Sequence, residues 1–182
     1  MKNTLIYLFT IYMFIIGCED KKVEEEEIID LSVKEFKSVN IKDNGSEFFT
    51  FVDNKGTTIE PSVWDLSFSV IEYKPSPLAP TIKDPVIVIG SGKKAAKVDA
   101  LSISDVNIIP DGLEFKTDEN GYHNTQGWYD YDGITHVMTP KDVVYVIDVG
   151  DNLYALVEIL DYYDDYGKSG VFTIHWKYLE KQ

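Results

Sequence analysis

The segment from Phe115 to Pro140 concentrates side chains that can ligate a metal centre or line a flat apolar ligand. It contains His123 and His136, two of the chain's three histidines, and Met138, the only methionine after Met13. Imidazole nitrogen and thioether sulfur are the side-chain donors that ligate haem iron without a thiolate. His123 together with either His136 or Met138 therefore forms the candidate axial pair, and both histidines are candidate metal ligands. Candidate walls for a porphyrin are the neighbouring aromatic residues Tyr122, Trp128 and Tyr129.

A structural explanation of the same residues stays open. The aromatic side chains can belong to a core, and His123 can be an exposed loop residue. His136 and Met138, two positions apart on a strand, can simply share one face. The residues taken alone favour this structural alternative, because isolated histidines are more often structural than ligating.

Signals for catalysis are sparse, and we expect a binding protein rather than an enzyme. The sequence has no G-x-S-x-G, H-E-x-x-H or EF-hand motif. The stretch 90–94, Gly-Ser-Gly-Lys-Lys, lacks the earlier glycine and the Ser or Thr of a phosphate loop and is predicted to be a turn with basic side chains. Loop carboxylates could flank a glycan or hold calcium, but acidic loop clusters are usually solvated. These carboxylates are Asp130, Asp132, Asp161, Asp164 and Asp165.

The N-terminus has the order of charged and apolar residues that export machinery recognises. The apolar run 5–17 is shorter than the roughly 17 residues that a spanning helix needs at least. It ends in Ile-Ile-Gly before Cys18, the chain's single cysteine, and resembles a bacterial lipobox. We therefore expect a signal peptide over 1–17, lipid attachment at Cys18, an acidic tether over 18–30 and one domain over 31–182. The acidic residues after Cys18 also look like the surface-export signal of Bacteroidetes lipoproteins, although a solvated linker has the same composition.

The charge balance limits the partners. The chain has 31 acidic against 17 basic residues and a formal net charge of −14. Nucleic acid and anionic lipid headgroups are therefore poor partners. We expect membrane contact only through the acyl chains of the anchor.

The elements that must position these candidates are strands. From residue 28 onward the hydrophobic period is two, and Val, Ile, Phe, Tyr and Trp are frequent. Segment 63–70 alternates with Trp64 on its apolar face, and 74–80, closed by Pro85, reads as a loop. Strands at 143–149, 153–160 and 171–179, with a glycine-containing connection at 150–152, predict a C-terminal antiparallel three-stranded meander. A short helix is expected at 33–39, with Ser32 as its N-cap. The expected class is all-β, an antiparallel two-sheet structure.

Four motifs occur in an order that resembles the HmuY-like family of haem-binding lipoproteins, and the similarity spans about residues 47–179. They are Trp64-Asp65-Leu66-Ser67-Phe68, Gly127-Trp128-Tyr129-Asp130-Tyr131 before His136 and Pro140, Val144-Tyr145-Val146-Ile147-Asp148 with Tyr154-Ala155-Leu156, and Gly170-Val171-Phe172-Thr173-Ile174.

The resemblance implies an HmuY-like all-β fold and a lipid anchor in the outer membrane, with the protein on the cell surface. It also implies haem held between two axial His or Met side chains and passed to an outer-membrane receptor for iron acquisition. The proline-rich stretch 71–89 departs from the family pattern. The alternative is therefore an adhesin or glycan-binding lipoprotein that keeps the scaffold without haem binding.

Overall fold

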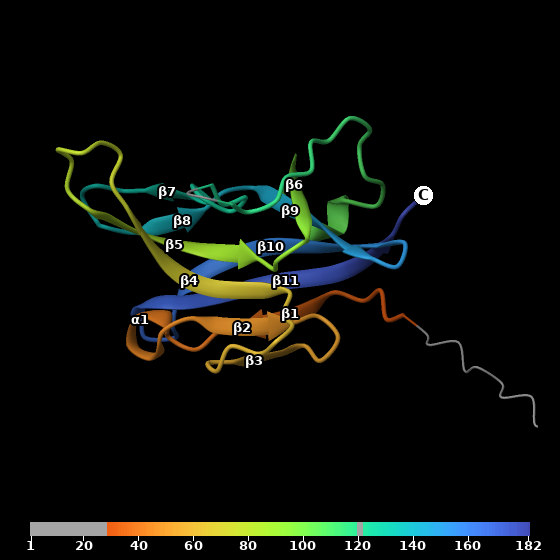
Figure 1. Cartoon of the computed structure of the whole chain (residues 1–182), viewed down its shortest axis with the longest axis horizontal. Helices are drawn as coiled ribbons and strands as arrows, with labels where there is room; N and C mark the ends of the chain where they lie inside the picture. The colour runs from red at the N-terminus through yellow and green to blue at the C-terminus, as the bar shows by residue number, and fades with distance from the viewer. Residues whose placement is uncertain (1–28, 120–121) are drawn as a thin grey trace, which may run out of the picture.

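The computed structural model describes residues 29–119 and 122–182 (Figure 1). The predicted signal peptide, Cys18 and the tether up to residue 28 lie outside the described residues. Apart from one α-helical turn and one 3-10 turn, the regular elements are strands. In chain order they are β1 (Lys34–Lys37), α1 (Ile41–Asn44), β2 (Glu47–Thr50), β3 (Lys55–Thr57), β4 (Leu66–Tyr73), β5 (Ile82–Ile89), β6 (Lys94–Asp99), η1 (Ile103–Asp105), β7 (Tyr129–Tyr131), β8 (Met138–Pro140), β9 (Val143–Gly150), β10 (Leu153–Tyr163) and β11 (Ser169–Glu180).

Two antiparallel sheets face each other across the core. One has the strand order β1-β11-β10-β9-β6 and the other β3-β2-β4-β5, while β7 and β8 form a separate two-stranded hairpin. The expected all-β class with two antiparallel sheets is confirmed. Within residues 29–119 and 122–182 no helix has the length and apolar character needed to cross a membrane.

The C-terminal meander is confirmed as β9, β10 and β11, which pair in sequence order. Along β11 the side chains alternate, so that Phe172, Ile174 and Trp176 are buried while His175 is only partly covered. The connection from β9 to β10 has positive φ at Gly150, Asp151 and Asn152, a conformation that glycine, aspartate and asparagine tolerate best. Side-chain period and turn chemistry together specify this part of the fold.

The predicted helix at 33–39 is wrong. Lys34–Lys37 forms strand β1, which pairs with β11 in a register that sets Phe36 opposite Ile174. The Phe36 ring packs against those of Phe49 and Phe68, at centroid distances of 4.5 and 5.4 Å. A capping signal around Ser32 is a local preference of modest energy, and burial of this aromatic side chain in the sandwich overrides it.

Strands β4 and β5 also differ from the sequence prediction. β4 begins at Leu66 rather than near Val63, and Trp64 is half-buried, with its ring edge against Phe48 at 5.4 Å. Pro85 does not close a loop but lies within β5, opposite Val70. β5 is the last strand of its sheet, and proline is tolerated there because an edge strand leaves alternate N–H groups unpaired.

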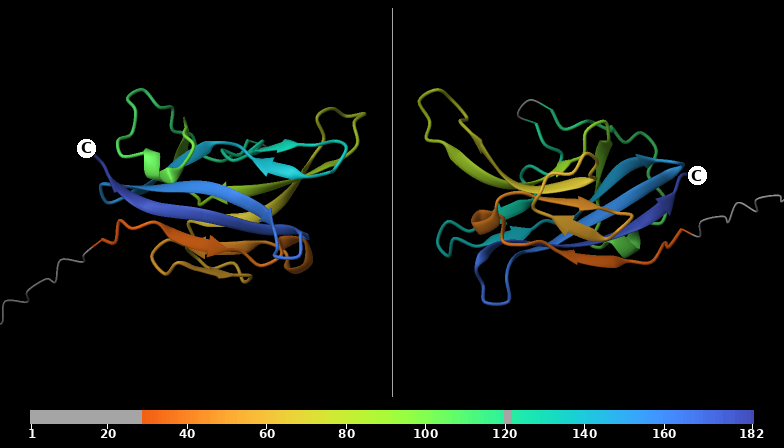
Figure 2. Two further views of the ribbon diagram at one scale, coloured as in Figure 1. Left: turned by 180° about the vertical axis from the view of Figure 1, so that it is seen from behind. Right: turned by 60° about the horizontal axis from the view of Figure 1, so that its bottom comes forward.

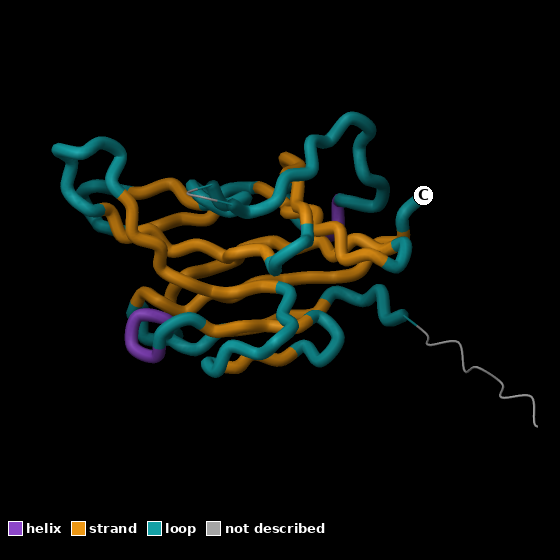
Figure 3. Tube along the Cα trace, in the orientation of Figure 1, coloured by secondary structure: helices purple, strands orange, loops and turns teal. Residues whose placement is uncertain are grey.

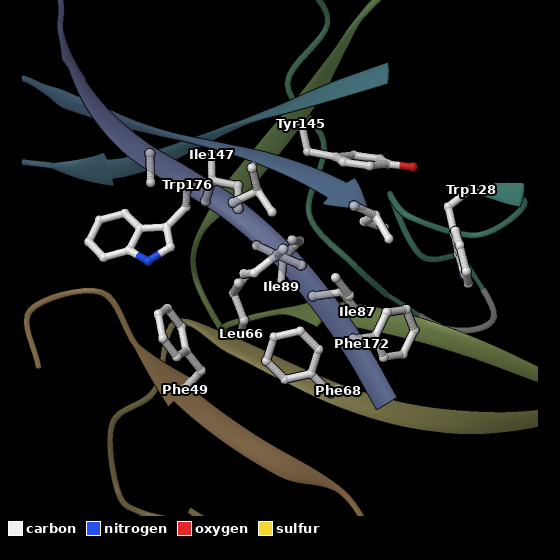
Figure 4. Close-up of a cluster of buried hydrophobic side chains, with 14 of the residues drawn as sticks. Phe49, Leu66, Phe68, Ile87, Ile89, Trp128, Tyr145, Ile147, Phe172 and Trp176 are labelled. Atoms are coloured by element: carbon white, nitrogen blue, oxygen red, sulfur yellow. The ribbon is translucent and has the colours of Figure 1, made fainter. Parts of the chain in front are cut away.

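Aromatic side chains from both sheets fill the core (Figure 4). Phe49 and Phe68 of one sheet meet Trp176 and Phe172 of the other, at ring-centroid distances of 6.0 and 5.6 Å. A second apolar cluster lies on the other face of β9 and β10, where η1 covers Val144, Val146 and Leu156. The five-stranded sheet is therefore covered on both faces at β9 and β10.

Several connections gather at one end of the sandwich. The 74–81 loop between β4 and β5 projects from this end, as does the β7–β8 hairpin, and α1 lies below them (Figures 1 and 3). The view from behind shows the same grouping (Figure 2). The first described residues and the C-terminus lie at the opposite end. A chain tethered at its N-terminus thus presents the loop-rich end away from its attachment point.

Candidate functional site

A groove of about 400 Å³ opens at the loop-rich end. We call it the arm–hairpin groove, because one wall is the extended β4–β5 hairpin, here termed the arm, and another is β8 of the β7–β8 hairpin. Both apolar and charged side chains line the groove. They are Ile41, Lys42, Val70, Glu72, Lys83, Pro85, Met138 and Tyr162.

The strand register explains which arm residues face the groove. Val70 pairs with Pro85 and Glu72 pairs with Lys83, and paired residues in a ladder share one face of the sheet. This face continues the one on which Phe68 enters the core. The groove-facing side of the arm is therefore an extension of the core-facing side of this sheet. It projects past the region that the opposite sheet covers.

The groove has charged groups at its margin. The ammonium group of Lys83 lies 2.8 Å from a Glu72 carboxylate oxygen, and this partner raises the pKa of Lys83. Lys42 donates to the Ser169 hydroxyl at 2.7 Å, and its ammonium group lies 5.7 Å from the centre of the Tyr162 ring. Lys42 and the Lys83–Glu72 ion pair thus place charged groups at the margin of a groove that also has apolar walls, which suits a largely apolar ligand with polar groups at one edge.

The β7–β8 hairpin presents two of the candidate ligands. Met138 lines the groove and packs against the core, and its backbone N–H donates to the Tyr163 hydroxyl at 2.8 Å. His136 lies in the exposed turn two residues earlier, with a φ of 60°. Its Nδ1 is 2.6 Å from the hydroxyl oxygen of Tyr131. Met138 and Tyr131 are paired in the hairpin register, so one face of the hairpin holds the thioether and the phenol that contacts the imidazole.

The turn itself is held by one carboxylate. Asp132 accepts hydrogen bonds from the backbone N–H of Ile134 at 2.7 Å and of Thr135 at 3.3 Å. These bonds lower the pKa of Asp132. The backbone N–H of His136 donates to the Asp132 carbonyl at 2.8 Å. Asp132 thus orders the turn that carries His136, through its side-chain Oδ1 and its backbone carbonyl.

His123 does not line the groove. It belongs to residues 122–128, which together with Asp118 cover the free edge of β5: Asp118 accepts the backbone N–H of Ile89, and Thr125 bonds to both backbone groups of Ile87. The His123 Nδ1 lies 3.5 Å from an Asp118 carboxylate oxygen and is buried without a hydrogen-bond partner among the described residues. Covering an edge strand protects it from pairing with another chain, so this segment has a structural task of its own.

The candidate wall residues occupy three different environments. Tyr122 is exposed, and its hydroxyl donates to Asn124 at 3.3 Å, away from the groove. Trp128 is only 2% exposed and packs in the core against Tyr162 and Phe172. It supports the groove from behind rather than lining it.

Tyr129 is the third candidate wall residue. Its hydroxyl donates to a carboxylate oxygen of Asp84 at 3.0 Å, and burial raises the pKa of Tyr129. Asp84 itself is 4% exposed, and burial raises its pKa more than the Tyr129 hydrogen bond lowers it. Because Asp84 is on β5 and Tyr129 on β7, the bond ties the hairpin to the arm.

Tyr162 is a groove residue that sequence reasoning missed. Its side chain is fully buried, and its hydroxyl has no hydrogen-bond partner among the described residues. Burial raises the pKa of Tyr162 to about 12, so the group is a neutral donor. In the sequence it is one of several tyrosines in an acidic connection, and only the fold brings it against Trp128 and the groove.

The donor set limits the metal chemistry of the site. Within residues 29–119 and 122–182 no three His, Cys, Asp or Glu side chains approach closely enough to hold a metal ion. His123 and His136 contact different partners, Asp118 and Tyr131. Of the three candidate axial residues, only Met138 lines the groove, and His136 lies in the exposed turn two residues before it.

No protein-family model matches the sequence, and no curated protein sequence matches it significantly. Solved structures do match. A Bacteroides fragilis protein assigned as a lipoprotein aligns with a TM-score of 0.59 and 16% identity over 82% of this chain and 91% of its own. A Bacteroides vulgatus protein assigned as an HmuY-like heme binding protein aligns with a TM-score of 0.59 and 16% identity over 84% and 94%. The apo HmuY analog of Tannerella forsythia aligns with a TM-score of 0.54 and 12% identity over 84% and 99%.

These alignments cover nearly the whole length of each solved chain. The protein therefore has the HmuY-like fold, and the resemblance drawn from its sequence motifs is confirmed at the level of structure. At identities of 12–16%, the structural alignments establish the fold alone. The ligand has to be argued from the groove.

Proposed function

We propose that this protein is a lipid-anchored haem-binding protein that takes up haem in the arm–hairpin groove for iron acquisition. The observation that carries the proposal is the groove itself, in which apolar side chains and the thioether of Met138 lie together at the loop-rich end of an HmuY-like fold, with an imidazole on the hairpin that supplies Met138. Haem bound there supplies an iron centre that accepts a side-chain donor.

The groove chemistry fits a porphyrin. Val70, Pro85 and Ile41 offer apolar surface to the macrocycle, whose burial would supply much of the affinity. The ammonium group of Lys42 at the margin suits one propionate, and Lys83 would bind the other by exchanging its Glu72 partner. Met138 lines the groove on the hairpin side, and His136 lies in the exposed turn of the same hairpin.

His136 is the leading iron ligand, with Met138 as the alternative. In the tautomer that leaves Nε2 free for iron, the Nδ1–H donates to the Tyr131 hydroxyl, and this type of outer hydrogen bond fixes ring orientation in metal sites. His123 is a poorer candidate than the sequence indicated, because its Nδ1 is buried beside Asp118 and its segment covers the edge of β5.

The arrangement of the ends agrees with a tethered protein. Lipid attachment at Cys18, followed by the acidic tether, would hold the molecule at its N-terminal end, and the groove would face away from the outer membrane surface. A groove exposed in this way is accessible to extracellular haem and to an outer-membrane receptor that would accept it. The role is capture without catalysis.

A haem titration tests the proposal. The lipidated chain is extracted in detergent and titrated with haem, with empty micelles and bovine apomyoglobin as blank and positive control. We expect a saturable Soret band at one haem per chain, and Lys42→Glu with Lys83→Glu should weaken binding about tenfold or more, as lost charge-assisted contacts do. A spectrum no different from empty micelles would reject haem binding and favour a glycan-binding role for the scaffold.

A further inference from the structure

The thioether and the imidazole proposed as iron donors for the arm–hairpin groove both belong to the β7–β8 hairpin. Met138 and Tyr131 are directly paired in the β7–β8 register, and Tyr131 contacts the His136 imidazole at 2.6 Å. Two side chains that leave the same short hairpin two residues apart approach a planar ligand from the same side. They compete for one axial position and do not occupy both.

The opposite wall has no equivalent donor. Residues 66–89, which form the arm, include no histidine, methionine or cysteine. The arm residues that line the groove are Val70, Glu72, Lys83 and Pro85. Tyr73 follows Glu72 along the strand, so its side chain emerges on the other face.

The remaining histidines are committed elsewhere. His123 stands beside Asp118 at the covered edge of β5, with its Nδ1 buried. His175 lies on the outward face of β11, with Nε2 3.5 Å from a Glu35 carboxylate oxygen. The chain contains three histidines in all, so the remaining one is His136, in the exposed turn of the β7–β8 hairpin two residues before the groove residue Met138.

We infer that haem is ligated from one side only, by His136, and that the axial position facing the arm stays open to a small exogenous donor. This rests on the proposed function and changes its chemistry. Side chains on both faces would saturate the iron, whereas ligation by a single histidine leaves a position for carbon monoxide on ferrous iron or for cyanide or imidazole on ferric iron. Tyr131 acts as a positioning residue through the Nδ1 of His136.

Spin state and ligand binding test this inference. Haem is added to the detergent-extracted chain at one equivalent, and sedimentation establishes that the complex holds one chain and one haem. We expect a high-spin ferric spectrum that becomes low-spin on adding cyanide while the haem stays bound, and a ferrous form that binds carbon monoxide. A low-spin, six-coordinate spectrum of this one-chain complex without added ligand would overturn one-sided ligation but leave haem binding intact. Absence of a saturable Soret band would reject both.

A gain-of-ligand variant makes the test sharper. Glu72→His places an imidazole on the groove-facing side of the arm, opposite the hairpin, and we expect it to convert the high-spin ferric complex to low-spin. Lys55→His, on exposed strand β3 away from the groove, is the matched control and should leave the spectrum unchanged. If the complex of Glu72→His still takes up cyanide as readily as that of the unaltered chain, the open position does not face the arm.

Tyr131→Phe addresses the positioning role. It removes the hydroxyl beside Nδ1 but keeps the ring, so haem should still bind, with an iron–histidine stretching frequency in the ferrous form that is lower than in the unaltered chain. An unchanged frequency would show that Tyr131 does not act through His136.

Discussion

The indole Nε1 of Trp128 donates a hydrogen bond to the backbone carbonyl of Pro85 at 2.8 Å. Pro85 lies on β5 and lines the arm–hairpin groove, whereas Trp128 ends the segment that covers the β5 edge. The contact joins the only indole N–H in that segment to an edge carbonyl that would otherwise be buried without a partner. Trp128 therefore fixes the position of the arm relative to the β7–β8 hairpin.

Replacing Trp128 should destabilise the protein strongly. Trp128→Ala removes a buried aromatic side chain and should lower the free energy of unfolding by about 3–5 kcal/mol. Trp128→Phe keeps most of the volume but leaves the Pro85 carbonyl unpaired, which should cost about 1–3 kcal/mol. Urea unfolding of each variant measures the loss.

Trp64 provides the comparison. Although its sequence pattern suggested a fully buried side chain, it is half-buried outside β4. Trp64→Ala should therefore cost only ~1 kcal/mol, a typical value for a single substitution. If Trp64→Ala lowered the free energy of unfolding as much as Trp128→Ala, the difference in burial between the two tryptophans would not explain their contributions to stability.

Asp84 should give the stability a dependence on pH. Its folded-state pKa is raised above the ordinary value of 3.8, because burial penalises the charged form. Below 3.8 the carboxyl is protonated in both states. As pH rises above 3.8 the unfolded chain releases its proton first, so the folded state loses stability until pH passes the folded pKa, after which the loss is constant.

The matched variant Asp84→Asn isolates this effect. Its amide oxygen can still accept the Tyr129 hydroxyl, but the group does not ionise. We expect the unfolding free energy of Asp84→Asn, relative to the unaltered chain, to increase with pH across that window. Tyr129→Phe should widen the window, because the hydroxyl it removes lowers the pKa of Asp84. A difference that is flat, or that falls with pH, would contradict the assigned direction.

The parts of the fold that the sequence predicted are those governed by local period and turn chemistry. Phe172, Ile174 and Trp176 alternate with partly exposed residues because β11 has one face on the core, and the left-handed residues at 150–152 specify the hairpin before β10. Such features depend on neighbours in the chain. They were therefore visible without a structure.

The wrong predictions concern residues whose structure is determined by contacts with residues far away in the sequence. Residues 34–37 became a strand because β11 offers them a partner and a place for Phe36. For the candidate site, closeness in sequence suggested that His123 and Trp128 share a pocket with Met138. In the structure His123 lies beside Asp118 at the β5 edge, and the Trp128 side chain is buried in the core. Tyr162 and Lys42 join Met138 only through tertiary packing.

Membrane attachment should depend on Cys18 alone. We expect Cys18→Ala, placed behind a leader that is cleaved without lipid attachment, to release the protein from the membrane fraction while its unfolding free energy stays unchanged. The reason is that acyl chains are the anchor, and the described fold begins downstream of the cysteine. Fractionation followed by urea unfolding measures both quantities. A protein that still pelleted with membranes would require another membrane contact.

The iron ligand can be assigned by separate substitutions of the three candidates. His136→Ala should weaken haem binding, and added imidazole should restore the spectrum, because the vacated position accepts the free ligand. Met138→Ala should lower affinity through lost apolar contact without changing the coordination spectrum. If Met138 were instead the ligand, its substitution would change the spectrum and lower the reduction potential, since thioether ligation raises that potential.

His123→Ala and His175→Ala complete the set. His175→Ala, on the outward face of β11, is the control and should leave binding unchanged. His123→Ala should likewise keep the coordination spectrum, because His123 is beside Asp118 and does not line the groove. A change of spin state in His123→Ala would restore His123 as an axial ligand. It would then require Asp118 and residues 122–128 to leave the β5 edge on binding. Faster hydrogen exchange of the Ile87 and Ile89 amides would reveal such a departure, because these amides are bonded to Thr125 and Asp118.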